Sequence, residues 1–122
     1  MSILAVTMAV GMQMTGCPPL IEDTQNVQPV SGWSVSVKNQ SRRLERVMLY
    51  IGEPSKRRSV MPVPGKTKGS QNWSFKGVDI WVECEYDHSA AVLTRNLGRI
   101  TSCDFVPRQG GTSDPAKLVC EN

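Results

Sequence analysis

The stretch "DIWVECEY", residues 79–86, decides the fold class of this 122-residue chain. Every second residue is apolar or a cysteine, so an extended strand would turn one face to a core and leave glutamates on the other. This period of two is typical of a half-buried β-strand and does not fit a helix. Trp81 falls on the glutamate side, and the core side would hold Ile80, Val82, Cys84 and Tyr86.

Similar patterns recur along the chain. Strands are predicted at "WSVSV" (33–37), "NWSF" (72–75) and "ITSCDFV" (100–106), each bounded by Gly, Pro, Asn or Asp. The segment "SRRLERVMLYI" (41–51) also fits helical spacing, but its short apolar run before Gly-Glu-Pro favours a strand. "AAVLTRNL" (90–97) would return beside 79–86 after a turn. We therefore predict a mainly β fold, a small antiparallel β-sandwich or open barrel, with room for one short helix.

The chain has four cysteines, an even count that suits two disulfides in an exported domain. Cys103 and Cys120 lie at equal distances from the midpoint of "GGTS" (110–113), so a hairpin turning there would set them opposite each other. This favours Cys103–Cys120 and leaves Cys17 for Cys84, with Cys84–Cys103 as the alternative. Each disulfide would stabilise the domain by roughly 2–4 kcal/mol. No CxxC pair is present, so we expect no metal site and no cofactor.

Residues 1–16 form a signal-like apolar segment, and residues 17–122 form a single β-rich domain. The segment lacks the usual positive n-region, so the natural start could lie upstream. "AVG" (9–11) has the small-x-small form that signal peptidase needs, whereas "MTGC" (14–17) resembles a lipobox and would make Cys17 a lipid anchor. The even cysteine count favours a disulfide for Cys17. We expect export to the periplasm or cell envelope.

Positive charge gathers in "GEPSKRRSVMPVPGKTKGSQ" (52–71), although the net charge of +3 does not indicate a nucleic-acid partner. A Pro- and Gly-rich loop of this length is usually functional or disordered. The charges either form a solvated surface or contact a partner, and an exposed Trp81 would be a plausible contact residue. Trp33 and Trp73 are expected in the core. The predicted partner-binding residues are Lys56, Arg57, Arg58, Lys66, Lys68 and Trp81.

Adjacent Asp87, His88 and Ser89 suggest a hydrolase triad, but neighbouring side chains on an extended chain point apart. All three residue types favour turns. The sequence contains no GxSxG, P-loop or GxGxxG motif. We therefore predict a protein that is not an enzyme and has no catalytic or cofactor-binding residues; a small hydrolase using His88 is the alternative.

Four segments read together resemble an uncharacterised family of small exported proteins of Gram-negative bacteria. They are "CPP" (17–19), "SGW" (31–33), "LERVMLYIGEPSKRRSVMP" (44–62) and "WVECEYDHSAAVLTRNL" (81–97) followed by Cys103. The family pattern has a Cys-Pro after the signal, a Gly-Trp, a Gly-x-Pro loop, a Trp-x-x-Cys-x-Tyr strand and two later cysteines. The resemblance implies export and paired cysteines, and it brings no known activity.

The leading functional hypothesis is a non-enzymatic periplasmic binding protein, such as an inhibitor or immunity protein against an envelope-targeted enzyme. Its partner would be a protein, and the positive charge of the chain favours an acidic one. The alternative is a structural or sensory lipoprotein, anchored at Cys17, whose basic loop binds lipid, glycan or another anionic envelope component. Neither hypothesis involves nucleic acid.

Overall fold

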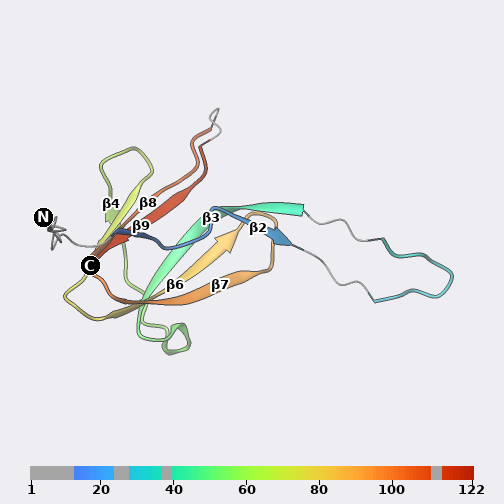
Figure 1. Ribbon diagram of the computed structural model, residues 1–122, viewed down its shortest axis with the longest axis horizontal. Coiled ribbons are helices and arrows are strands. Elements are labelled where there is room, and N and C mark those ends of the chain that lie inside the picture. The colour runs from blue at the N-terminus through green and yellow to red at the C-terminus, as the bar shows by residue number, and fades with distance from the viewer. Residues whose placement is uncertain (1–12, 24–27, 37–39, 111–113) are drawn as a thin grey trace, which may run out of the picture.

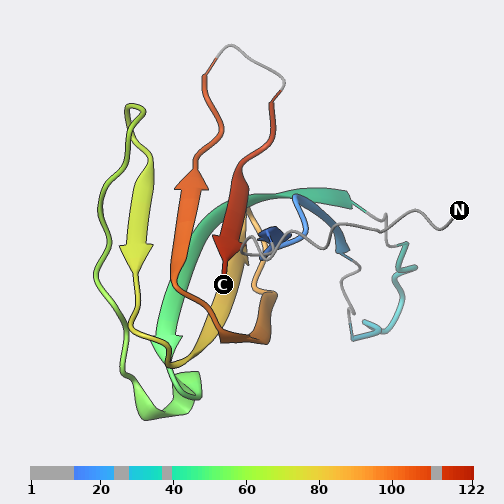
Figure 2. The ribbon, with the colours of Figure 1, turned by 60° about the vertical axis from the view of Figure 1, so that its left-hand side comes forward.

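The computed structural model describes residues 13–23, 28–36, 40–110 and 114–122, and it has two antiparallel sheets (Figures 1 and 2). The first sheet has the strand order β1-β9-β8-β5-β4, and the second has the order β2-β3-β6-β7. The predicted antiparallel β fold is confirmed. The elements are β1 (Gln13–Thr15), β2 (Leu20–Asp23), β3 (Gln40–Ile51), the 3-10 helix η1 (Pro54–Lys56), β4 (Val63–Pro64), β5 (Gln71–Ser74), β6 (Asp79–Tyr86), β7 (Val92–Arg99), β8 (Ser102–Val106) and β9 (Lys117–Glu121).

Strand β6 lies in the middle of the second sheet, where it pairs with both β3 and β7. Its alternate residues are buried, as the "DIWVECEY" pattern predicts. The strand interpretation of residues 41–51 is also confirmed. A register shift between Leu44 and Arg46 lets Leu44 and Val47 both face the core. This bulge therefore explains why two core residues of this strand are three positions apart, as they would be in a helix.

The first sheet contains the β8–β9 hairpin with the predicted register. Cys103 lies opposite Cys120, and Phe105 lies opposite Leu118. Strand β5 pairs with β8 and buries Trp73, whose indole N–H donates to the Val60 carbonyl at 3.0 Å. The core prediction for Trp73 is thus confirmed. Strands β1 and β2 and the two-residue edge strand β4 are not predicted by the sequence patterns.

Both disulfides favoured by the cysteine spacing are present, Cys17–Cys84 and Cys103–Cys120, and the alternative pairing is wrong. Cys103–Cys120 joins neighbouring strands of one sheet, whereas Cys17–Cys84 joins the chain after β1 to β6 in the other sheet. Residues 16–19 pass from the first sheet to the second, and we call them the crossing segment. This segment is also held by the Tyr86 hydroxyl, which donates to the Pro18 carbonyl at 2.7 Å. The two sheets are therefore tied covalently across a core that contains all four cysteines.

The predicted signal-like segment lies outside the described residues as far as residue 12. Its last part is described: β1 pairs with β9, and the Gly16 N–H donates to the Leu118 carbonyl at 3.0 Å. No helix among the described residues is long and apolar enough to cross a membrane.

The strand predicted at residues 33–37 is wrong over its described part, because residues 33–36 belong to no strand. The core prediction for Trp33 is also wrong, since 78% of its surface is exposed. Residues 28–36, which we call the arm, extend away from both sheets in two views (Figures 1 and 2). Alternation produces a half-buried strand only where a neighbouring strand and a core are available, and the arm has neither.

Candidate partner-binding surfaces

The outer face of the second sheet is formed by the residues that alternate with its core residues. Strand pairing places Tyr50 beside Trp81, Met48 beside Glu83 and Arg46 beside Glu85. Strand β7 extends this face with Thr94 opposite Glu83 and Val92 opposite Glu85. We call the whole surface the Trp81 face; it comprises Arg46, Met48, Tyr50, Trp81, Glu83, Glu85, Val92 and Thr94.

The centre of the Trp81 face is aromatic and apolar. Trp81 is half-buried rather than fully exposed, and Tyr50 beside it is buried. Met48 and Val92 are exposed large apolar residues on the same face. Rigid aromatic side chains surrounded by polar groups are typical of the energetically important part of a protein interface.

The carboxylates of the Trp81 face already have partners within the sheet. The Tyr50 hydroxyl donates to Glu83 Oε2 at 3.2 Å, and Arg46 Nε lies 3.0 Å from Glu85 Oε2. Burial, and then the nearby negative charge of Glu83, raises the pKa of Tyr50, so its phenol stays protonated and remains a donor at neutral pH. Glu85 is therefore paired with a positive charge, whereas Glu83 keeps its negative charge beside a neutral phenol.

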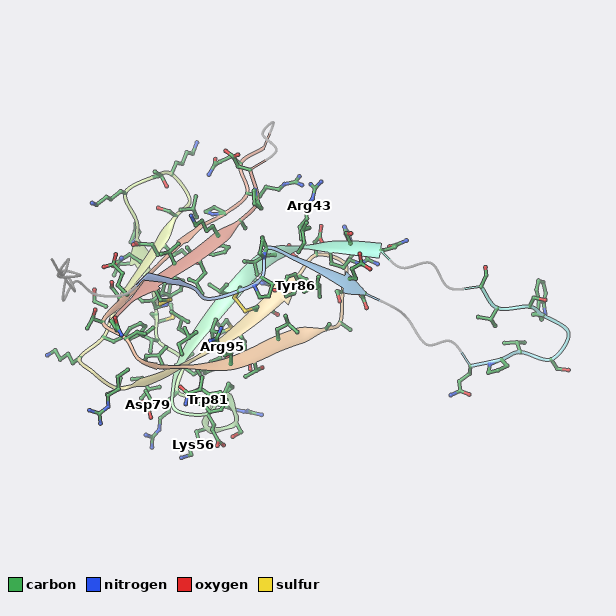
Figure 3. All side chains as sticks on the ribbon, in the orientation of Figure 1. Arg43, Lys56, Asp79, Trp81, Tyr86 and Arg95 are labelled. Carbon is green, nitrogen blue, oxygen red and sulfur yellow. A yellow bond between two sulfur atoms is a disulfide. The ribbon has the colours of Figure 1, made fainter. Side chains whose placement is uncertain are left out.

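The structure brings the first basic group next to this face. Lys56, Arg57 and Arg58 are exposed, and η1 contacts β6. Figure 3 shows Lys56 and Trp81 at the same end of the second sheet. The loop folds back along β3, because the Ile51 N–H donates to the Arg58 carbonyl at 2.9 Å. These three cations thus form a basic rim at one end of the Trp81 face.

The second basic group lies elsewhere. Lys66 and Lys68 belong to the turn between β4 and β5, which lies at the opposite end of the molecule from η1 in both ribbon views (Figures 1 and 2). An open hollow of about 680 Å³ adjoins this turn and is lined by Lys66, Asn72 and Asp104 among others. The long basic loop of the sequence is therefore two separate surfaces in space.

Asp87, His88 and Ser89 form a turn, as predicted, and not a catalytic triad. Asp87 Oδ1 accepts a hydrogen bond from the Arg43 backbone N–H at 2.7 Å, while the Ser89 hydroxyl donates to Asp23 Oδ2 at 2.8 Å. His88 is exposed and has a φ of 51°. Within the part of the chain that the structure describes, no group of three His, Cys, Asp or Glu side chains could hold a metal ion.

The exposed apolar arm is the surface that sequence reasoning missed. Its described residues are all exposed, and they include Val30, Trp33 and Val35. The sequence contains two indications of this exposed segment: "QPVSGWSVS" (28–36) has no charged residue, and it has a Ser-Gly turn before the tryptophan. The alternation of serine with valine and tryptophan led to the prediction of a strand instead.

A family model described as Type VI secretion system Tli immunity protein matches residues 20–121. The chain belongs to this family. The match includes β2 to β9, both surfaces described above and the arm. No curated protein and no solved structure matches the chain.

Membership makes the chain an immunity protein that binds a protein partner, its effector, and has no enzymatic role. The part of the leading hypothesis that makes the chain an immunity protein with a protein partner is thereby confirmed, as is the prediction that the chain is not an enzyme. This family assignment is also more specific than the one expected from the sequence, which was an uncharacterised family of exported proteins. Cys17 lies just before the matched region, whereas its disulfide partner Cys84 lies within it.

Proposed function

We propose that this Tli immunity protein acts in the periplasm and neutralises its type VI effector by binding it with the Trp81 face and the basic rim of Lys56, Arg57 and Arg58. The family match is the observation that carries the binding role. The periplasmic location is supported by two disulfides within the core, since such bonds persist in oxidising compartments.

The chemistry of the Trp81 face supports its role as the contact surface. An effector side chain packed on Trp81 would contact a rigid indole that loses little conformational freedom on binding. Glu85 is paired with Arg46, and three exposed cations, Lys56, Arg57 and Arg58, lie at one edge of the face. An effector with an acidic patch beside an apolar patch would complement this arrangement.

The experiment uses the purified type VI effector that this chain protects against, with affinity measured by calorimetry. The double variant Arg57→Glu/Arg58→Glu should weaken binding by about tenfold or more, and the loss should shrink as salt is raised. Trp81→Ala should weaken binding by at least about 30-fold. Thermal unfolding of each variant shows whether the fold is intact.

Lys66→Glu/Lys68→Glu is the matched control, because it makes the same change in charge at the opposite end of the molecule. We expect it to leave the affinity within about threefold of the wild-type value. If this control weakens binding while the Arg57 and Arg58 reversal does not, the contact lies at the β4–β5 turn. If the wild-type chain neither binds the effector nor protects cells that export it to the periplasm, the proposed function is wrong.

A further inference from the structure

We propose that the arm, residues 28–36, is a second effector-binding element that places Trp33 in an apolar recess of the effector. This inference rests on the proposed binding function and adds a site to it. The observation behind it is the exposure of Trp33, at 78%, together with the exposure of Val30 and Val35 on the same short segment. Exposed apolar groups gathered on a projecting segment mark an interaction site.

Local geometry gives the arm a defined tip. The Trp33 N–H donates to the Val30 carbonyl at 2.9 Å, which closes a turn over Ser31 and Gly32. Gly32 has a φ of 87°, a conformation that glycine adopts without steric cost. Trp33 therefore follows directly on a closed turn that projects from the body (Figure 1).

The strands that precede and follow the arm in the sequence, β2 and β3, pair with each other in the second sheet. Strand β2 pairs with β3 from Leu20 opposite Arg43 to Asp23 opposite Gln40. The Asp23 carboxylate accepts a hydrogen bond from Ser89 at 2.8 Å and lies 3.7 Å from Arg42 Nε. The strand that precedes the arm in the sequence is thus fixed to the β6–β7 turn.

The chemistry of the arm favours a protein recess over other occupants. Residues 28–36 are uncharged, so burying them in a protein pocket leaves no charge without a partner. Segments that lie on anionic membranes usually carry Lys or Arg beside their apolar residues, and the arm carries none. A convex, tryptophan-bearing tip needs a concave apolar partner, and the effector is the partner that family membership supplies.

The arm and the basic rim can be tested separately because they lie at opposite ends of β3. The arm precedes Gln40 and the rim follows Ile51, so the 12 residues of β3 separate them. A strand of that length spans roughly 40 Å. Truncation of Trp33 therefore leaves the Trp81 face and its rim unchanged.

The test compares Trp33→Ala with Met61→Ala, using the same purified type VI effector as the probe. Met61 is the matched control because it is 83% exposed and lies outside the arm and the Trp81 face. Trp33→Ala should raise the dissociation constant by at least about 30-fold, and Met61→Ala should change it by less than about threefold. Both variants should unfold at the wild-type temperature, since neither side chain is in the core.

If Trp33→Ala binds like the wild type while Trp81→Ala does not, the arm proposal is wrong and the proposed function stands. If the wild-type chain fails to bind the effector, the proposed function fails and the arm proposal fails with it. Vesicles of phosphatidylethanolamine and phosphatidylglycerol test the membrane alternative. Vesicle binding that depends on Trp33, with effector affinity unchanged in Trp33→Ala, would also overturn the proposal.

Discussion

Gly16 belongs to the lipobox-like motif "MTGC", but in the fold it has a packing role. Its backbone N–H donates to the Leu118 carbonyl at 3.0 Å, so the chain here runs directly against β9. A Cβ atom at this position would lie 2.5 Å from Leu118 Cδ2. Leu118 is fully buried, which leaves it little room to move away. The glycine is therefore required by close approach between the crossing segment and the first sheet.

We predict that Gly16→Ala lowers the free energy of unfolding by about 1–3 kcal/mol, because the added methyl group overpacks the core against Leu118. Chemical denaturation of the purified, disulfide-bonded protein measures the change. Gly110→Ala is the control, since a Cβ there meets no atom within 4 Å. Equal stability of the two variants would show that Leu118 yields without cost and that the glycine is not needed for packing.

The three tryptophans show how far single residues can be predicted from sequence. Trp73 enters the core because its strand finds β8 as a neighbour, and Trp81 stays on the outer side that its alternation gives. Trp33 has the same local pattern of alternation, yet residues 33–36 belong to no strand. Alternation predicts which residues share a face of a strand, but only the tertiary structure decides whether other parts of the protein bury that face.

At the level of elements, the long strands and the hairpin register are predictable, whereas β1 and β2 are not. β6 has a strong period of two, and the cysteine spacing sets the β8–β9 register correctly. β1 and β2 are short and carry no such pattern. They form because β9 and β3 offer them edges for backbone hydrogen bonds, a property of the assembled sheets and not of the local sequence.

The two disulfides should contribute unequally to stability, because they close loops of different length. Cys17 and Cys84 are 67 residues apart, whereas Cys103 and Cys120 are 17 apart. Loop entropy then gives about 4 kcal/mol for the first bond and about 3 kcal/mol for the second. We predict that Cys17→Ala/Cys84→Ala is less stable than Cys103→Ala/Cys120→Ala.

Urea denaturation of the two double variants measures this difference directly. The comparison is matched, because all four sulfur-bearing side chains are buried to a similar degree and each variant makes two cysteine-to-alanine changes. A larger loss in Cys103→Ala/Cys120→Ala would mean that native-state contacts around the β8–β9 hairpin outweigh loop entropy.

At the scale of the whole molecule, sequence reasoning found the residues of one candidate surface but not their arrangement. Lys56 to Lys68 lie in one loop of the sequence, yet β4 lies between the two basic groups, and the chain carries them to opposite ends. Trp81 joins the first group only because η1 contacts β6. Sequence separation predicts neither the distance between the two basic groups nor the position of Trp81 beside the first, since both depend on how the two sheets are arranged.

The fold also bears on how the N-terminus is processed. Cleavage after Gly11, at "AVG", would leave β1 intact, whereas cleavage before Cys17 would remove Gln13–Thr15 and leave β9 without this neighbour. A lipid anchor would also need the Cys17 sulfur, which is bonded to Cys84. We therefore predict that the exported protein begins at Met12, carries no acyl group and has no free thiol.

Intact-mass measurement of protein from the periplasm tests this prediction, with thiol titration of the denatured, unreduced sample beside it. Cys17→Ser is the informative variant. Signal peptidase does not use the cysteine, so this variant should still be cleaved after Gly11, although it would lose the tie between the sheets. Lipoprotein processing requires the cysteine and would stop in the variant. A wild-type species that begins at Cys17 and carries a diacylglyceryl group would contradict the prediction, and the chain would then be an immunity protein tethered to a membrane.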